Sequence, residues 1–249
     1  MKICIAQTRP VRGNIPANIE RHTLFIESAI NNKADTIMFP ELSITGYEPG
    51  LAKQLATNAD DHRFDIFKDM SNQGGINICI GVPCQLNGGI QIGMIIFSPS
   101  RQAALYSKQY LHDDELPFFK AGQRQVLAFE QENRLSLSIC YELSVPEHAQ
   151  HAFEAGAEIY ISSVAKTATG VEKAAETLSG IARKYKMIVL MSNCVGHCDD
   201  FDCGGRSAAW NRQGELIAQM DSTSEAMMII DTESEQYFEL TQPKGTAAE

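Results

Sequence analysis

The sequence predicts an α/β protein in which two mixed β-sheets pack together and helices cover their outer faces. Apolar segments with the two-residue period of strands alternate with segments of helical period from end to end. Hairpin-type turns at 86–89 and 211–214 add antiparallel strand pairs to the βα units, so both sheets are expected to be mixed. Two sheets packed together, with helices outside them, would bury this many strands.

The expected strands follow the alternation of apolar and polar residues. In the segment 134–140, Leu135, Leu137 and Ile139 alternate with Ser136 and Ser138, which is the pattern of a half-buried strand. The full set of expected strands lies at 2–8, 36–40, 76–84, 90–98, 103–108, 134–140, 157–163, 187–193, 205–211, 215–220 and 225–231.

Helices are expected where apolar residues recur with helical spacing. The first expected helix has Asn14 as its N-cap and Pro16 in its first turn, and it places Ile19, Ile26 and Ile30 on one face. The last one sets four side chains at helical spacing: Ala174, Leu178, Ile181 and Tyr185. The full set of expected helices lies at 16–34, 60–72, 146–155 and 171–186.

The chain shows no linker, composition break or internal repeat, so one domain is expected over residues 1–240, followed by a C-terminal tail at 241–249. Its 31 acidic and 21 basic residues leave a net charge of −10. An acidic chain without Lys/Arg clusters is a poor candidate for binding nucleic acid or anionic membranes. The expected partners are a small-molecule substrate and further copies of the same chain.

The seven cysteines form an odd number without the spacing of a disulfide framework. The N-terminal MKICIAQT enters a strand directly and lacks the apolar region and cleavage site of a signal peptide. No apolar run approaches the ~20 residues of a membrane span. The cysteines are therefore expected to be reduced thiols, and the protein is expected to be cytoplasmic.

Cys140 is the candidate nucleophile, because it ends an alternating strand and opens a turn into the helix that begins near Pro146. A thiol at such an elbow faces backbone N–H groups of a helix start, which favour the thiolate. Most cysteines in such a chain are inert core residues, and Cys4 and Cys79 lie in strand-like segments of that kind.

Three further residues are candidates for chemistry. Glu41 directly follows the apolar segment TIMF, so its carboxyl group could be a buried general base, or it could cap a neighbouring loop. Lys108 ends a strand and could stabilise a developing oxyanion, or it could be a solvated surface lysine. Glu115 could position the lysine or the substrate, or it could be one of several solvated acids.

These four residues and the segments around them resemble the nitrilase superfamily of carbon–nitrogen hydrolases, whose members use a Glu-Lys-Cys triad. The glutamate box of the family corresponds to FPELSITGY, its lysine box to YSKQYL and its nucleophile box to SICYELSVPE. Its second glutamate, in the pattern E-x-x-x-F-x-x-G, matches Glu115, Phe119 and Gly122. The resemblance covers nearly the whole chain.

The resemblance implies a mechanism. Cys140 would attack the substrate carbon, Glu41 would act as general base, and Lys108 with the backbone N–H of Tyr141 would stabilise the oxyanion. Glu115 would support this arrangement. A thioester would form and water would hydrolyse it, and this chemistry requires neither a metal nor a cofactor.

The resemblance also implies a fold and an activity. The fold would be a four-layer α-β-β-α sandwich with two mixed six-stranded-type sheets, which commonly dimerises through its outer helices. The activity would be hydrolysis of a non-peptide C–N bond in a small amide or N-carbamoyl compound, with release of ammonia or an amine. Nitrile hydrolysis by the same triad, and a catalytically idle binding or regulatory protein of the same fold, are the alternatives.

The residues expected to contact substrate, besides Tyr141, are Tyr47, Ser163 and Lys166. Lys166 invites a role in carboxylate recognition, and the alternative is a surface lysine. The sequence departs from the family at Ser144 and Val145, where many members have an arginine and an aromatic residue. This difference does not affect the triad, but the identity of the substrate is left undetermined.

The sequence offers two alternative sites, a metal site and a Cys–His dyad. His197, Cys198 and Cys203, with the aspartates at 199, 200 and 202, fit no zinc-finger or C-x-x-C spacing, so a polar loop near the site mouth is expected there and not a metal centre. His148 and His151 follow Cys140 on the expected helix and would point away from the elbow, so a Cys–His dyad is not expected.

Overall fold

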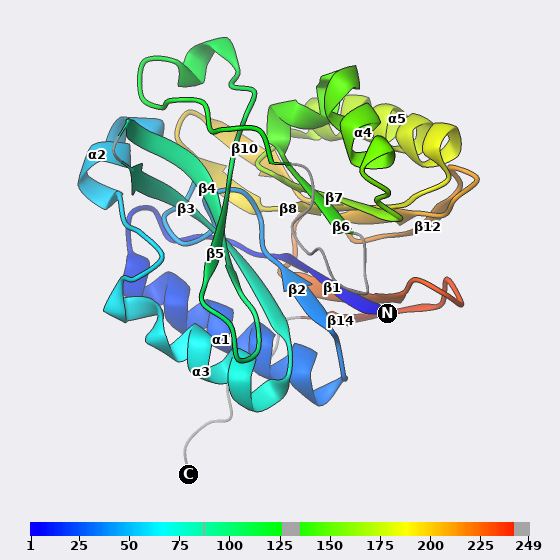
Figure 1. Ribbon diagram of the computed structural model, residues 1–249, viewed down its shortest axis with the longest axis horizontal. Coiled ribbons are helices and arrows are strands. Elements are labelled where there is room, and N and C mark those ends of the chain that lie inside the picture. The colour runs from blue at the N-terminus through cyan, green and yellow to red at the C-terminus, as the bar shows by residue number, and fades with distance from the viewer. Residues whose placement is uncertain (87, 126–134, 242–249) are drawn as a thin grey trace.

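The computed structural model describes residues 1–86, 88–125 and 135–241, and within them two β-sheets face each other between outer helices (Figure 1). The first sheet has the strand order β14-β13-β1-β2-β3-β4-β5 and the second has the order β12-β11-β8-β7-β6. In the first sheet β1, β2 and β3 run parallel and the other neighbours pair antiparallel. In the second sheet β6, β7 and β8 are parallel, and β11 and β12 are antiparallel. Mixed sheets were predicted and are present.

The bounds of the strands are as follows. The first sheet contains β1 (Lys2–Gln7), β2 (Thr36–Met38), β3 (Asn77–Leu86), β4 (Gly89–Phe97), β5 (Ala104–Ser107), β13 (Ala226–Asp231) and β14 (Tyr237–Thr241). The second contains β6 (Leu135–Ile139), β7 (Ile159–Val164), β8 (Ile188–Asn193), β11 (Ala208–Trp210) and β12 (Leu216–Gln219). A separate ribbon is formed by β9 (Val195–Cys198) and β10 (Phe201–Gly204).

The helices have the following bounds. The longer ones are α1 (Ile15–Asn31), α3 (Asp65–Gly74), α4 (Pro146–Glu154) and α5 (Ala168–Tyr185), and α2 is the short helix Ala52–Leu55. Single 3₁₀ turns lie at Pro49–Leu51, His62–Phe64, Asp113–Glu115 and Cys140–Ser144. No helix in the described ranges is long and apolar enough to cross a membrane.

The core follows from the alternation of the strands. In β1, Ile3 and Ile5 point into the layer between the sheets, where they meet Leu137 of β6 and Leu190 of β8. The intervening Cys4 of β1 points the other way, into the layer between the first sheet and helices α1 and α3. Because side chains alternate across a strand, one apolar segment supplies two core layers at once.

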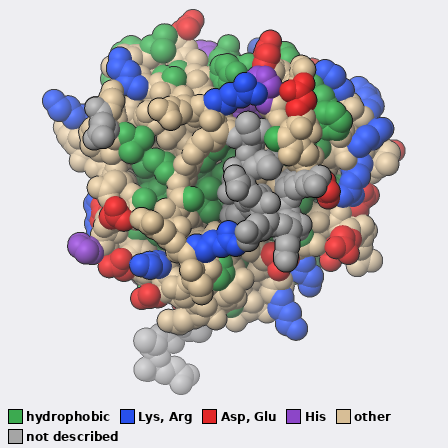
Figure 2. All heavy atoms as spheres, viewed as in Figure 1, with side chains coloured by type: hydrophobic (Ala, Val, Ile, Leu, Met, Phe, Trp, Pro, Cys, Tyr) green, Lys and Arg blue, Asp and Glu red, His purple; other side chains and the backbone are tan. Residues whose placement is uncertain are grey.

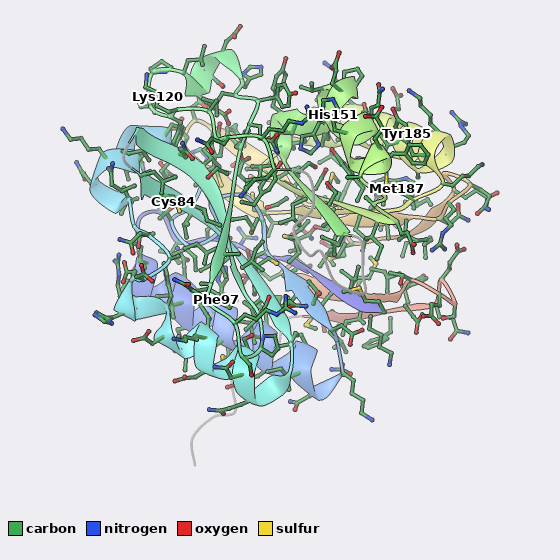
Figure 3. The ribbon with its side chains drawn as sticks, viewed as in Figure 1. Cys84, Phe97, Lys120, His151, Tyr185 and Met187 are labelled. Atoms are coloured by element: carbon green, nitrogen blue, oxygen red, sulfur yellow. The ribbon has the colours of Figure 1, made fainter. Side chains whose placement is uncertain are left out.

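Each sheet is covered by its own pair of helices. Asn14 accepts a hydrogen bond from the backbone N–H of Ala17 at 3.2 Å, so it caps α1 as predicted. Phe97 packs in the layer between the first sheet and α3, whereas Tyr185 and Met187 lie at the opposite side of the molecule with α4 and α5 (Figure 3).

Basic side chains gather at the C-terminal end of α5, over which Lys and Arg are visible in Figure 2. Arg183 and Lys184 lie in its last turn, and Lys186 follows as its cap. Cations at this end complement the helix dipole.

Three features of the strands differ from the sequence-based expectation. The described sheets have seven and five strands instead of six each. The segment around His197, expected to be a polar loop, forms the β9–β10 hairpin, and β14 was not expected at all. Gly196, Gly204 and the acids between them hid the alternation in the hairpin, and β14 is a largely exposed edge strand. The tail expected at 241–249 lies outside the described residues except for Thr241, which ends β14.

Candidate active site

Cys140 lies at the elbow where β6 ends and a 3₁₀ turn begins. Its φ of 44° falls in the left-handed region, which a residue with a side chain adopts only when its surroundings hold it there. Pro146 then opens α4, as the sequence predicted. Cys140 is half-buried as a residue and borders a cavity of ≈ 310 Å³.

The thiol group of Cys140 is not predisposed to ionise. Burial and the nearby carboxylate of Glu41 raise its pKa to about 11, although Lys166 and Lys108 act in the opposite direction. The expectation of a thiolate was therefore wrong, because the local argument from the helix start left out burial and the negative charge beside the thiol. A base must accept the proton when Cys140 reacts.

Lys108 joins two buried carboxylates. Its Nζ donates to Oε1 of Glu41 at 2.8 Å and to Oε1 of Glu115 at 2.6 Å, and its side chain has no exposed surface. The solvated alternatives for Lys108 and Glu115 are thereby excluded, and Glu41 pairs with the lysine instead of capping a neighbouring loop. The elements that deliver them are the ends of β2 and β5 and the 3₁₀ turn at 113–115.

The backbone around Lys108 is held from both sides. Its N–H donates to the carbonyl of Ile92 at 2.8 Å, and its own carbonyl accepts from the N–H of Gly122 at 2.8 Å. A Cβ on Gly122 would lie 2.5 Å from Cβ of Ser107, so only glycine allows this close approach. Close packing against Ser107 thus explains why the last position of the E-x-x-x-F-x-x-G pattern is a glycine.

The charges in this cluster determine its protonation. Burial alone would lower the pKa of Lys108, but Glu41, Cys140 and Glu115 outweigh it and raise the pKa above its ordinary value, so the ammonium persists. Burial raises the pKa of Glu41, against the attraction of Lys108, which makes this carboxylate a stronger base than an exposed one. Within the described residues, Oε2 of Glu41 is buried and has no hydrogen-bond partner.

Glu115 is fixed by further hydrogen bonds. Tyr47 donates its hydroxyl to Oε1 at 3.0 Å, and the backbone N–H of His112 donates to Oε2 at 2.9 Å. With Lys108, these donors engage both oxygens of the carboxylate. Glu115 is therefore suited to holding Lys108 in place, and its oxygens are less available for proton transfer than Oε2 of Glu41.

Glu142 is a buried acid that the sequence analysis missed. Its carboxylate accepts from the backbone N–H groups of Ile139 at 2.7 Å and Gln109 at 2.5 Å, and from the hydroxyl of Tyr106 at 2.7 Å. Burial raises its pKa to about 7 despite these bonds. Glu142 thus ties the elbow before Cys140 to the residue after Lys108. An acid two positions beyond the candidate nucleophile was the signal that could have revealed it.

The remaining predicted contact residues divide into two groups. Tyr47, Tyr141 and Lys166 line the cavity beside Cys140. Ser163 does not line it, because its buried hydroxyl donates to the carbonyl of Phe39 at 2.9 Å and links the two sheets. A further lining residue, Phe201 of the β9–β10 hairpin, was not predicted.

His148 interacts with two tyrosine hydroxyl groups. Its Nε2 lies 2.8 Å from the hydroxyl of Tyr106 and its Nδ1 lies 2.8 Å from the hydroxyl of Tyr160. Burial lowers the pKa of its imidazole to about 4, so the ring is neutral. His148 supports the Glu142 network through the hydroxyl of Tyr106.

The sequence matches the family described as Carbon-nitrogen hydrolase over residues 2–240, and the chain belongs to this family. It is similar to the "Hydrolase in agr operon" of Staphylococcus aureus (23% identity, 92% of this chain and 90% of the relative). It is also similar to the 2-oxoglutaramate amidase of Bacillus subtilis strain 168 (26% identity, 83% of this chain and 81% of the relative).

Among solved structures, the amidase from Nesterenkonia sp. AN1, a member of the nitrilase superfamily, superposes with a TM-score of 0.84 at 19% sequence identity and covers 94% of each chain. The α/β fold is therefore that of nitrilase-superfamily proteins, as the resemblance implied. With the family match and the amidase relatives, the protein is an amidase-like carbon–nitrogen hydrolase.

Proposed function

We propose that the protein hydrolyses a non-peptide C–N bond of a small amide or N-carbamoyl compound through a thioester on Cys140. One observation carries this proposal. The buried ammonium of Lys108 holds Oε1 of Glu41, while Oε2 of the same carboxylate has no partner among the described residues and can receive a proton. The cavity gives a substrate access to Cys140, and Glu41 lies close enough to this residue to influence the pKa of its thiol.

The first half of the reaction forms the thioester. As Sγ of Cys140 bonds to the substrate carbon, its proton moves to Glu41 and the carbonyl electrons move onto oxygen. Lys108 has three N–H donors and uses two on carboxylates, so the third, with the N–H of Tyr141 in the first turn after the elbow, can stabilise the oxyanion. The C–N bond then breaks, and Glu41 returns the proton to the leaving nitrogen.

The second half releases the product. Glu41 takes a proton from water as the water oxygen attacks the thioester carbon. The C–S bond breaks and the proton passes to sulfur, which restores the thiol of Cys140 and frees the acid. A carboxylate with a raised pKa suits both halves, because it must accept and donate the same proton.

The cavity supports a substrate that carries a negative group. Lys166 lines it and is half-buried, and within the described residues its ammonium forms no ion pair. Tyr47 and Phe201 line the same cavity and supply apolar contacts. We therefore favour a small amide that bears a carboxylate, and the similarity to a 2-oxoglutaramate amidase supports this choice.

Turnover of a substrate panel tests the reaction. The protein is incubated with ω-amides, N-carbamoyl amines and nitriles, and ammonia release is compared between wild type and Cys140→Ala. Intact mass spectrometry of the acylated enzyme follows the thioester. Release that needs Cys140 supports the proposal, and release from nitriles alone would favour the nitrilase alternative. If no substrate gives either turnover or adduct, the protein is an idle binding member of the family.

Lys166→Met tests the substrate class. The KM of amides bearing a carboxylate should rise, whereas neutral amides of the same size should be unaffected, because only the former lose a charge partner. Lys173→Met, an exposed lysine on α5, is the matched control. Equal effects on both kinds of amide would contradict carboxylate recognition by Lys166.

We also propose that the chain forms a homodimer through its outer helices. Phe153 of α4 is 49% exposed, and its ring packs 5.2 Å from that of Tyr185 on α5, so an aromatic pair lies at the outer surface. Phe153→Asp should dissociate the dimer in analytical ultracentrifugation. A monomeric wild type would contradict this proposal.

A further inference from the structure

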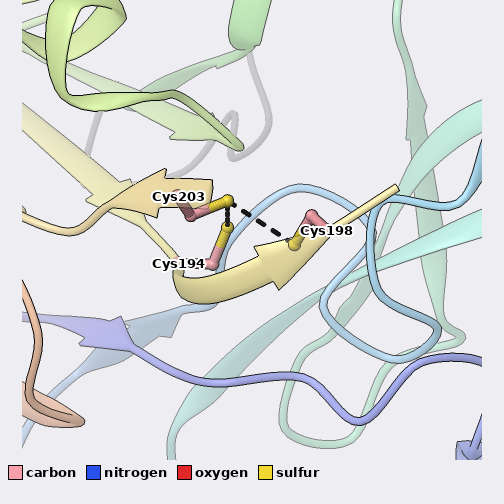
Figure 4. Close-up of side chains that lie close together, drawn as sticks. All are labelled: Cys194, Cys198 and Cys203. Carbon is pink, nitrogen blue, oxygen red and sulfur yellow. Dashed lines mark hydrogen bonds between the residues drawn. The ribbon is translucent and has the colours of Figure 1, made fainter. Parts of the chain in front are cut away.

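Three cysteines converge on one side of the β9–β10 hairpin (Figure 4). Cys194 precedes β9, Cys198 ends it, and Cys203 in β10 pairs with Gly196. Positions two apart on a strand share a face, as do directly paired positions, so the hairpin register places all three side chains together. The Sγ of Cys203 lies 2.7 Å from that of Cys194 and 3.5 Å from that of Cys198.

The cluster contains only sulfur donors and is shielded from water. The three Sγ atoms all lie within 4.8 Å of one another, and the cysteines are 1%, 1% and 6% exposed. His197 and Asp202, which the sequence analysis grouped with Cys198 and Cys203, pair with each other at 3.0 Å on the exposed face of the same hairpin. Strand alternation therefore separates the hard donors from the thiols.

We propose that Cys194, Cys198 and Cys203 bind one soft, thiophilic d¹⁰ metal ion, with Cu⁺ preferred over Zn²⁺. Thiolates select such ions over Mg²⁺ or Ca²⁺. Three sulfurs match the trigonal coordination that Cu⁺ accepts, whereas Zn²⁺ in a closed protein site takes four ligands and would need water as the fourth. This site is separate from the proposed hydrolysis and does not depend on it.

Binding requires a small local rearrangement. At metal–sulfur distances of about 2.3 Å, three ligands of one ion lie roughly 3.8–4.0 Å apart. The Cys198–Cys203 pair is already close to this spacing, and Cys194 must move away from Cys203 by about 1 Å, within reach of a side-chain rotation. Each thiol loses a proton to the solvent as its metal–sulfur bond forms, and no electron is transferred.

Metal binding would also stabilise one wall of the cavity. Phe201 lies in the hairpin between Cys198 and Cys203, lines the cavity, and packs its ring 5.7 Å from that of Tyr47. Joining the two strands beneath Phe201 through one ion would restrict the movement of this wall. The proposed ion would thus have a structural role next to the site.

Metal titration tests the proposal without an activity assay. In a Cys140→Ala background, which removes the cysteine that borders the cavity, the reduced protein is titrated anaerobically with Cu⁺, Zn²⁺ and Mg²⁺. Native mass spectrometry and the ultraviolet thiolate–metal absorption band report binding. We expect one Cu⁺ per chain, weaker binding of Zn²⁺ and none of Mg²⁺. Cys194→Ser, Cys198→Ser and Cys203→Ser should each weaken Cu⁺ binding by more than about 100-fold, since even outer-shell changes cost 10–100-fold.

Cys84→Ser is the matched control, because Cys84 is a buried thiol on β3, outside the cluster (Figure 3). Circular dichroism confirms that each variant is folded, and a variant that is not is replaced by its Cys→Ala counterpart. The proposal is overturned if the reduced protein binds no Cu⁺ or Zn²⁺, or if Cys84→Ser weakens binding as much as the cluster variants. It is also overturned if intact mass shows that Cys194 and Cys203 form a disulfide that resists reduction.

Discussion

The Nζ of Lys108 lies 2.8 Å from Oε1 of Glu41, and neither side chain is exposed. This contact joins the end of β5 to the end of β2 and leaves the other oxygen of Glu41 unpaired within the described residues. One ammonium thus orients the general base and, through its remaining proton, can face the oxyanion. Its removal should affect both stability and turnover.

Lys108→Ala should reduce turnover by at least ~10²-fold, because an oxyanion donor is lost. It should also lower the free energy of unfolding by about 3–5 kcal/mol, since two buried carboxylates lose their cation. Steady-state kinetics and urea unfolding measure the two effects. Lys120→Ala, at an exposed lysine (Figure 3), should change neither. Near-normal turnover of Lys108→Ala would remove this lysine from the mechanism.

Glu41→Gln removes both the proton acceptor and the negative charge beside Cys140, and two different measurements report these two losses. Turnover should fall by about 10²–10⁴-fold, the usual contribution of a general base. The pKa of Cys140 should nevertheless fall below about 11, because the carboxylate that raises it has become neutral. The pH dependence of Cys140 alkylation by iodoacetamide, followed by peptide mass spectrometry, measures this shift. Glu147→Gln makes the same charge change at the surface and should leave the alkylation profile unaltered.

The sequence and the family resemblance were sufficient to predict that Glu41, Lys108 and Glu115 meet near Cys140, but they missed Glu142 and Phe201 and did not predict how deeply the site is buried. Their positions at or just after strand ends made Glu41, Lys108 and Cys140 candidates, and the resemblance of the segments around them to the nitrilase superfamily joined them into one site. The surface alternative for Lys108 and the loop-cap alternative for Glu41 could be rejected only from the packing of segments far apart in the chain. The charge state of Cys140 was mispredicted for the same reason, since burial and Glu41 are tertiary effects.

The cysteine cluster shows a second limit of prediction from the sequence. Recognising that Cys194 lies with Cys203 requires the hairpin register, which pairs Cys203 with Gly196. Glycines and acids in this segment obscure the alternation from which a strand is predicted. From the sequence, His197 was considered together with Cys198 and Cys203 and a metal site was rejected on their spacing, whereas the register places His197 on the face of the hairpin opposite the cysteines.

Glu142→Gln should loosen the elbow that carries Cys140. The carboxylate accepts hydrogen bonds at both oxygens, and an amide would turn an NH₂ group toward one of these donors, leaving a buried backbone N–H of Ile139 or Gln109 unpaired. We expect a loss of about 1–3 kcal/mol in unfolding free energy and a lower kcat with little change in KM. A change in KM alone would place Glu142 outside the positioning of Cys140.

The same variant should alter how stability depends on pH. The pKa of Glu142 is raised from 4.5 to about 7 in the folded protein, so folding takes up a proton between these values. Its contribution to stability is present below pH 4.5 and is lost as the pH rises through about 7. Urea unfolding across this range should show a flatter profile for Glu142→Gln than for wild type, and identical slopes would contradict the raised pKa.

The pH dependence of kcat/KM should report the ionisation of Glu41. The proposed base must be a carboxylate, and burial raises its pKa above the ordinary 4.5, so activity should fall on the acid side with a midpoint above that value. We do not expect kcat/KM to rise further as the pH approaches about 11, the pKa of Cys140, because the thiol transfers its proton to Glu41 during attack. Glu142 titrates at about 7 and could produce a similar acid limb, but Glu142→Gln removes that group. An acid limb that keeps its midpoint in Glu142→Gln belongs to Glu41, and one that disappears assigns the limb to Glu142 and contradicts the role of Glu41 as the titrating base.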